Sequence, residues 1–130
     1  MIVDSSALIA ILYGEPEAQD CAAAMYALPC RMSAANFLET AIVIDSARSP
    51  VPSHRLDDLT AQIRMVIEPV TQEHAHIARR AYRDYGRGSG HPARLNFGDC
   101  FAYALARTTG EPLLFKGDAF RHTDITPALA

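Results

Sequence analysis

Short apolar runs alternate with longer amphipathic stretches throughout this 130-residue chain. The short runs are rich in β-branched and other apolar residues, as expected for buried strands of a sheet. They predict five strands, at residues 2–3, 30–32, 66–70, 112–115 and 124–126. Because helical patterns separate these strands, the chain should form an α/β sandwich with a five-stranded parallel sheet.

The longer stretches place apolar residues three or four positions apart, which is the spacing of one helix face. Turn and capping residues mark where these helices begin and end. The first helix should begin at Ala7, with Ser5 or Ser6 as its N-cap, and end at Gly14. Further helices are predicted at about residues 15–28, 34–47, 53–63, 72–85 and 97–109.

The composition is that of an ordinary globular protein, with 49% hydrophobic residues and a mean hydropathy near zero. Residues 1–130 are expected to form one domain with a single packed core. No apolar run approaches the roughly 20 residues that cross a bilayer, and the opening residues lack a basic signal region. We expect a cytoplasmic protein with no membrane association, in which Cys21, Cys30 and Cys100 are reduced and partly buried.

Two aspartates follow predicted strands. Asp4 comes directly after Ile2 and Val3, and Asp118 follows the strand that ends at Phe115. Ligands of open parallel sheets bind beyond the carboxyl ends of the strands, so both carboxylates are candidates for a site at that edge. A simple turn aspartate would also explain Asp118.

Glu39 lies on a predicted helix that is apolar nearly all the way round, which indicates burial. By helical spacing it shares a face with Asn36, Thr40 and Val43. A buried carboxylate must be paired, protonated or bound to a metal ion, because an isolated buried charge is too costly. The alternative is a glutamate at the helix edge that pairs with a nearby arginine.

Asp99 falls three residues after Asn96, the predicted N-cap of its helix. It can therefore act as the acid of a capping box that stabilises the helix start. That role does not explain Gly98, a poor helix former whose missing side chain permits close approach by another group.

Strand ends and helix starts could bring four acids to one edge of the sheet: Asp4, Glu39, Asp99 and Asp118. Clustered carboxylates raise one another's pKa unless a cation neutralises them. Their hard oxygens suit Mg²⁺ or Mn²⁺. A site of this kind carries out phosphoryl transfer or hydrolysis, in which the metal activates water as the nucleophile. No histidine set competes with them, because His74 and His76 are two residues apart on a helix and face different ways.

Four sequence blocks occur in the order and spacing of the PIN domain: residues 1–8 (MIVDSSAL), 36–39 (NFLE), 96–106 (NFGDCFAYALA) and 113–118 (LLFKGD). The whole chain resembles VapC-type toxins of bacterial toxin–antitoxin pairs. This resemblance implies a PIN-like three-layer α/β/α sandwich, a Mg²⁺- or Mn²⁺-dependent endoribonuclease acting on RNA, a homodimer and a VapB-like antitoxin. It also implies that Asp4, Glu39, Asp99 and Asp118 are the catalytic, metal-binding acids, with Ser6 supporting the first of them.

Basic residues suggest two further hypotheses. The net charge of −3 argues against RNA binding through bulk positive charge, yet five arginines cluster in one segment: Arg79, Arg80, Arg83, Arg87 and Arg94. They could guide RNA phosphates toward the acids, above all Arg87 and Arg94, or form only a solvated helix face. Lys116 stands two residues before Asp118 and could pair with it or occupy the space of a second ion.

Two other enzyme or signalling classes fit poorly. A haloacid-dehalogenase-like phosphatase needs a second aspartate two residues after the first, where this chain has Ser6. A receiver domain needs an aspartate after its third strand, where this chain has Glu68 and Pro69. The alternative that stays open is a catalytically silent PIN-like domain that binds RNA or a partner.

The toxin hypothesis also predicts how a partner would inhibit the protein. An acidic pocket is a receptor for a cation, so the partner should insert an arginine or lysine among the acids. Its helix should lie in an apolar groove around Leu8, Ile42 and Ile63.

Overall fold

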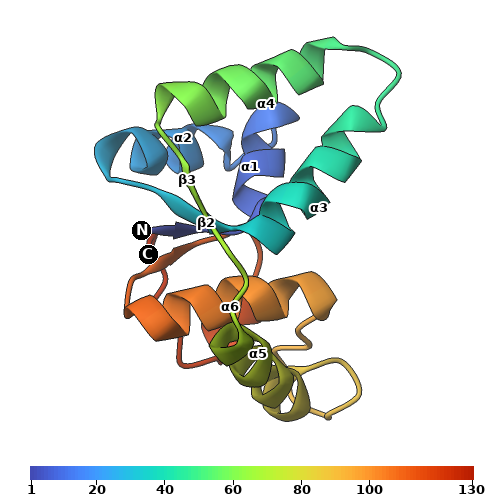
Figure 1. The fold of residues 1–130 in the computed structure, drawn as a ribbon, viewed down its shortest axis with the longest axis vertical. Coiled ribbons are helices and arrows are strands. Elements are labelled where there is room, and N and C mark those ends of the chain that lie inside the picture. The colour runs from blue at the N-terminus through green and yellow to red at the C-terminus, as the bar shows by residue number, and fades with distance from the viewer.

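The computed structural model describes all 130 residues and is built around a parallel sheet (Figure 1). The sheet has four strands in the order β3-β2-β1-β4. Their bounds are β1 (Ile2–Val3), β2 (Arg31–Ser33), β3 (Val66–Glu68) and β4 (Leu113–Leu114). The first strand of the chain is therefore an inner strand, paired with β2 on one side and β4 on the other.

The predicted fifth strand at residues 124–126 was wrong, since this segment contributes one isolated bridge between Leu113 and Pro127. The Leu113 amide donates to the Thr126 carbonyl at 2.9 Å, and the Ala128 amide donates to the Leu113 carbonyl at 2.8 Å. The chain bends at residues 123–124 before this bridge and again at residue 128 directly after it. Pro127 has no backbone N–H and cannot donate a hydrogen bond to a further strand, so it suits a position at the edge of the sheet.

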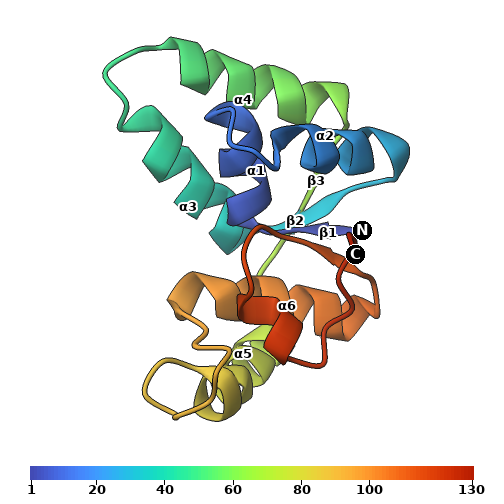
Figure 2. The same ribbon diagram turned by 180° about the vertical axis from the view of Figure 1, so that it is seen from behind.

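Helices cover both faces of the sheet, as the three-layer prediction required (Figures 1 and 2). One face carries α1 (Ser5–Leu12), α2 (Ala18–Ala27), α3 (Ala34–Asp45) and α4 (Val51–Gln62). The other face carries α6 (Phe97–Thr109), with α5 (Gln72–Tyr85) packed against it and the short 3-10 helix η1 (Ala119–His122) nearby.

Each face has its own hydrophobic cluster, because successive strand side chains point to opposite sides. Ile2 and Leu113 belong to the cluster under α5 and α6, whereas Val3 and Leu114 belong to the cluster under α1 to α4. The three cysteines are free and buried within these clusters, as expected for reduced residues. No helix is both long enough and apolar enough to span a membrane.

Helix α3 is buried on one side only, so the prediction of burial all round was wrong. Asn36, Thr40 and Ile44 face the interior, while Leu38 and Ile42 are 59% and 60% exposed. An apolar face of α3 is thus left uncovered beside Glu39.

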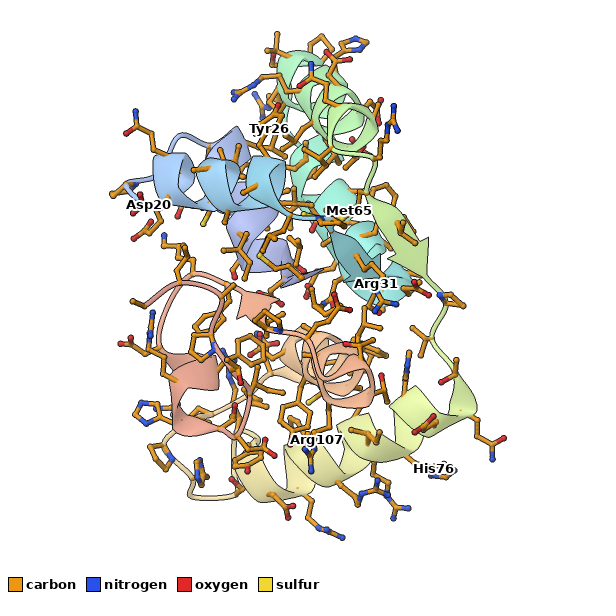
Figure 3. The ribbon with its side chains drawn as sticks, turned by 90° about the vertical axis from the view of Figure 1, so that its left-hand side faces the viewer. Asp20, Tyr26, Arg31, Met65, His76 and Arg107 are labelled. Carbon is orange, nitrogen blue, oxygen red and sulfur yellow. The ribbon has the colours of Figure 1, made fainter.

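The amino edge of the sheet is held by ion pairs around Arg31, which Figure 3 shows at the start of β2. Its guanidinium pairs with Glu111 and, at 3.4 Å, with Glu68. The terminal amine of Met1 pairs with Glu111 at 2.7 Å. The candidate acids lie at the opposite, carboxyl edge, where α1, α3 and α6 begin.

Candidate active site

Asp4 is placed by the junction between β1 and α1. Its backbone amide donates to the Leu114 carbonyl at 2.9 Å, which ties it to the neighbouring strand. Its carboxylate is itself the N-cap of α1, accepting the Ser6 amide at 3.1 Å, so the prediction of a serine N-cap was wrong. Asp4 is only 4% exposed, and its carboxylate is therefore fixed at the carboxyl edge of an inner strand.

Ser6 donates its hydroxyl to the same Asp4 oxygen at 2.6 Å. The Ser6 hydroxyl oxygen in turn accepts the backbone amide of Lys116 at 3.0 Å. Because this lone pair is occupied by a donor, the hydroxyl proton points to Asp4. The predicted contact between Ser6 and the first acid is present, while its role in catalysis stays a prediction.

Lys116 does not pair with Asp118, contrary to one of the two hypotheses for this lysine. Its ammonium pairs with Glu15 and lies 3.8 Å from Glu17, both on the segment between α1 and α2. The lysine therefore ties the loop after β4 to the segment after α1.

Glu39 is held where three helix starts meet. Its Oε1 accepts the hydroxyl of Ser5, the first residue of α1, and lies 3.4 Å from the Asn36 side-chain nitrogen. No arginine pairs with Glu39, so the helix-edge ion pair is not formed. Ser5 was considered only as a helix cap, and Asn36 only as a residue on the same helix face as Glu39. Their contacts with the acid were not predicted, although the shared face was a signal.

Gly98 makes room for Glu39, which explains the glycine that the capping role of Asp99 left unexplained. A Cβ atom at residue 98 would lie 2.8 Å from the Glu39 carboxyl carbon and closer still to one of its oxygens. The Asn36 side chain also donates to the Gly98 carbonyl at 2.9 Å. The start of α6 therefore packs directly against the acid of α3.

Asp99 forms the capping box that its spacing predicted. Its Oδ2 accepts the Asn96 amide at 2.9 Å, and the Asn96 side-chain oxygen accepts the Asp99 amide at 2.9 Å. This role occupies Oδ2 alone, and no hydrogen bond is made to Oδ1. Capping and a role in a site are therefore compatible.

The three acids act on one another electrostatically. Burial, followed by the nearby charges of Asp99 and Glu39, raises the pKa of Asp4 to about 6 despite the Ser6 hydrogen bonds. Burial and the charge of Glu39 also raise the pKa of Asp99, whereas the hydrogen bond from the Asn96 amide and the charge of Arg87 lower it. These effects indicate one shared negative region at the carboxyl edge.

The raised pKa of Asp4 has a consequence for stability. Protonated Asp4 is favoured in the folded protein, so its contribution is complete below about pH 4 and lost as pH rises through about 6. The rise from 3.8 corresponds to about 3 kcal/mol. In EDTA at pH 7.5 we expect Asp4→Asn to raise the free energy of unfolding by up to about 3 kcal/mol.

Urea unfolding between pH 4 and pH 7.5 measures this effect. The gain of Asp4→Asn over wild type should shrink toward pH 4, while the exposed-site variant Asp118→Asn should show no such gain. A difference between Asp4→Asn and wild type that does not depend on pH would contradict the assignment of this cost to the buried charge.

Asp118 differs from the other three acids in its exposure and its lack of side-chain partners. It is exposed and precedes η1, and its side chain makes no hydrogen bond or ion pair. Its backbone carbonyl accepts the Arg121 amide at 3.0 Å, and Gly117 before it has a φ of +96°. This is the turn aspartate of the simpler interpretation, and a role in metal binding stays a prediction.

The side chains as they stand do not form a closed ligand set: no group of three or more His, Cys, Asp or Glu residues is arranged to hold a metal ion. One oxygen of each of Asp4, Glu39 and Asp99 instead accepts a hydrogen bond from a protein donor. The donor chemistry nevertheless fits a hard divalent cation, because every candidate atom is a carboxylate oxygen.

The arginines of the predicted cluster are all exposed. Arg87 is close enough to Asp99 to lower its pKa, and the amide of Arg87 donates to the Leu95 carbonyl at 3.0 Å. Arg94 adopts a left-handed backbone with a φ of +51°, which is uncommon for a residue with a side chain. Two of the five arginines therefore flank the start of α6.

Comparison with known proteins shows the family of the chain. The PIN domain family model matches residues 1–125. Ribonuclease VapC28 of Mycobacterium tuberculosis is 55% identical over 130 residues, covering 99% of this chain and 98% of the relative. The chain belongs to the VapC family of PIN-domain proteins. The resemblance inferred from the four sequence blocks is thereby confirmed.

Two solved structures share the VapC fold at low sequence identity. M. tuberculosis VapC20, a sarcin-ricin loop cleaving toxin, has a TM-score of 0.73 at 16% identity and covers 96% of this chain and 95% of its own. A toxin–antitoxin complex from Klebsiella pneumoniae has a TM-score of 0.65 at 17% identity, covering 92% and 88%. Both likenesses support the fold alone.

Proposed function

We propose that this VapC-family protein is a divalent-metal-dependent endoribonuclease and the cytoplasmic toxin of a toxin–antitoxin pair. The observation that carries the proposal is the meeting of Asp4, Glu39 and Asp99 at the carboxyl edge of the sheet, with Gly98 making room for the second acid. The ribonuclease name of a relative 55% identical over its full length supports the same activity.

The three acids, with Asp118 as a weaker or water-mediated fourth, would hold Mg²⁺ or Mn²⁺. When bound, the ion supplies Lewis-acid activation of water and stabilises charge on the phosphate. Ser6 keeps Asp4 oriented through its hydroxyl, and the capping box fixes Asp99 through Oδ2 while leaving Oδ1 without a protein partner. Arg87 offers a positive charge beside Asp99 for an RNA phosphate.

Metal removal tests the function directly. We expect the purified protein to cleave RNA with Mg²⁺ or Mn²⁺, to stop in EDTA and to recover when the ion is restored. The alternative, a catalytically silent PIN-like domain, predicts RNA binding without cleavage. Cleavage that persists in EDTA would exclude the metal-dependent mechanism.

Arg87 and Arg94 would guide RNA to the acids. The double variant Arg87→Gln/Arg94→Gln should bind RNA more weakly, because it loses two phosphate contacts. The slope of log affinity against log salt concentration should fall by about 1.4, the contribution of two phosphate contacts on a single strand. RNA binding to an uncleaving Asp99→Asn background, measured across salt concentrations, gives the slope. The control, Arg48→Gln/Arg64→Gln, changes two exposed arginines that flank α4. Equal slopes in the two double variants would leave the cluster as a solvated surface.

A VapB-like antitoxin would inhibit by placing an arginine or lysine among Asp4, Glu39 and Asp99. The predicted groove needs correction, because Leu8 is fully buried and Ile63 packs against the core. The apolar hollow that borders Glu39 is lined by Ala35, Leu38, Ile42, Val43, Phe97 and Phe101. We expect the inhibitory helix there, and a toxin–antitoxin structure with no basic side chain at the acids would refute this mode.

A second apolar hollow lies on the other side of Phe97 and suits a homodimer. Phe97 is 78% exposed and stacks edge-on against Phe101 with ring centroids 4.9 Å apart. The hollow beside it is lined by Ala75, Ala78, Arg79, Tyr82, Cys100 and Phe101. A projecting ring next to an apolar hollow is self-complementary under two-fold symmetry. Phe97→Glu should sediment as a monomer, whereas Leu28→Glu, at another exposed apolar site, should not change the oligomeric state.

A further inference from the structure

Asn36 is fully buried at the contact between α3 and α6. Its side-chain nitrogen donates to the Gly98 carbonyl at 2.9 Å and lies 3.4 Å from Glu39 Oε1. One amide group therefore joins the start of α6 to the carboxylate of α3. This places Asn36 directly behind the acid cluster.

The Asn36 side chain is not explained by the stability of the helix. Its side-chain oxygen is buried without a hydrogen-bond partner, which is an unfavourable state for a polar atom. Its backbone carbonyl is already satisfied by the Thr40 hydroxyl at 2.9 Å. An apolar residue of similar size would avoid the unpaired oxygen, so the amide must be retained for what its nitrogen holds.

Ser5 contacts the same carboxylate from a different helix. It is buried and donates its hydroxyl to Glu39 Oε1, while the Asn36 carbonyl lies 3.4 Å from that hydroxyl. Oε1 thus receives donors from α1 and α3, and Oε2 faces the Cα of Gly98. The carboxylate is therefore restrained from three helices, by Ser5 of α1, Asn36 of α3 and Gly98 of α6.

We propose that Ser5 and Asn36 are positioning residues that hold Glu39 ready for a divalent cation. The inference rests on the proposed function only in that the acids bind such an ion. Both residues are buried, so they act through Glu39 and not through contact with RNA. Groups that orient a ligand in this way contribute typically 10–100-fold to metal affinity.

Calorimetric titration of Mn²⁺ into folded protein tests the proposal. We expect Ser5→Ala and Asn36→Leu each to bind Mn²⁺ about 10–100-fold more weakly. Cleavage should fall at limiting Mn²⁺ and recover at saturating Mn²⁺, while the KM for RNA at saturating Mn²⁺ stays unchanged. Asn36→Leu also removes the unpaired oxygen, so its urea midpoint should stay close to that of wild type.

Thr40→Val is the matched control, since it removes a buried hydroxyl that donates to Asn36 without touching Glu39. It should bind Mn²⁺ like wild type. Wild-type affinity in Ser5→Ala and Asn36→Leu, or an equal loss in Thr40→Val, would overturn the positioning role and leave the proposed function intact. A wild-type protein that binds no Mn²⁺ would overturn the proposed function as well.

Discussion

Asp99→Asn is expected to lower the rate of RNA cleavage by at least about 1000-fold at saturating Mg²⁺. The loss of one charged ligand removes several kcal/mol of transition-state stabilisation, and about 4 kcal/mol corresponds to this factor. An asparagine oxygen can still accept the Asn96 amide, so the start of α6 should stay capped. Single-turnover cleavage of a labelled RNA, with circular dichroism to check the fold, measures the effect.

Asp118→Asn is the comparison that ranks the acids. Asp118 is exposed and has no side-chain partner, so it restrains an ion less than Asp4, Glu39 or Asp99. We expect a clearly smaller loss than for Asp99→Asn, and recovery of much of it at high Mn²⁺. Lys116 pairs with Glu15, so an ion pair between Lys116 and Asp118 is not the reason for this difference. Undiminished cleavage by Asp99→Asn would exclude the proposed active site. An Asp118→Asn enzyme that is as inactive as Asp99→Asn, and is not rescued by Mn²⁺, would show that all four acids contribute equally as metal ligands.

The features predictable from the sequence are those set by local chemistry. A β-branched pair followed by an acid predicted β1 and the position of Asp4, because strand and helix starts follow from neighbouring residues. The same holds for the capping box of Asn96 and Asp99. Gly98 was a sharper signal, since a poor helix former in a first turn predicted close approach by another group, and that group is Glu39.

The features that were missed depend on contacts between distant segments. Ser5 looked like a cap and is instead a donor to Glu39, 34 residues away. Lys116 was judged by its neighbour Asp118, yet it pairs with Glu15, 101 residues away. Helix α3 has apolar residues on nearly all of its faces, so its sequence does not indicate which face packs against the sheet. The exposure of Leu38 and Ile42 was therefore unexpected. The short bridge at Pro127 depends on bends that propensity does not encode.

Gly98→Ala tests whether Glu39 must lie against α6. An added Cβ would come within 2.8 Å of the Glu39 carboxyl carbon, so the acid must swing out of the cluster. Alanine favours a helix over glycine by about 1 kcal/mol, which offsets part of this strain. We therefore expect cleavage to fall at least about 100-fold, about 3 kcal/mol, while the free energy of unfolding changes by no more than about 1 kcal/mol.

The same substitution in a Glu39→Ala background separates the two effects. Without the carboxylate there is nothing for the new Cβ to displace, so Gly98→Ala should cause no further loss of cleavage. It should instead stabilise the protein by up to about 1 kcal/mol through helix propensity. Groups in direct contact show such non-additivity, and a full cycle of four proteins measures it by cleavage rate and urea unfolding. Losses that simply add would mean that Gly98 acts through α6 alone, and a fully active Gly98→Ala would mean that Glu39 need not approach α6 at all.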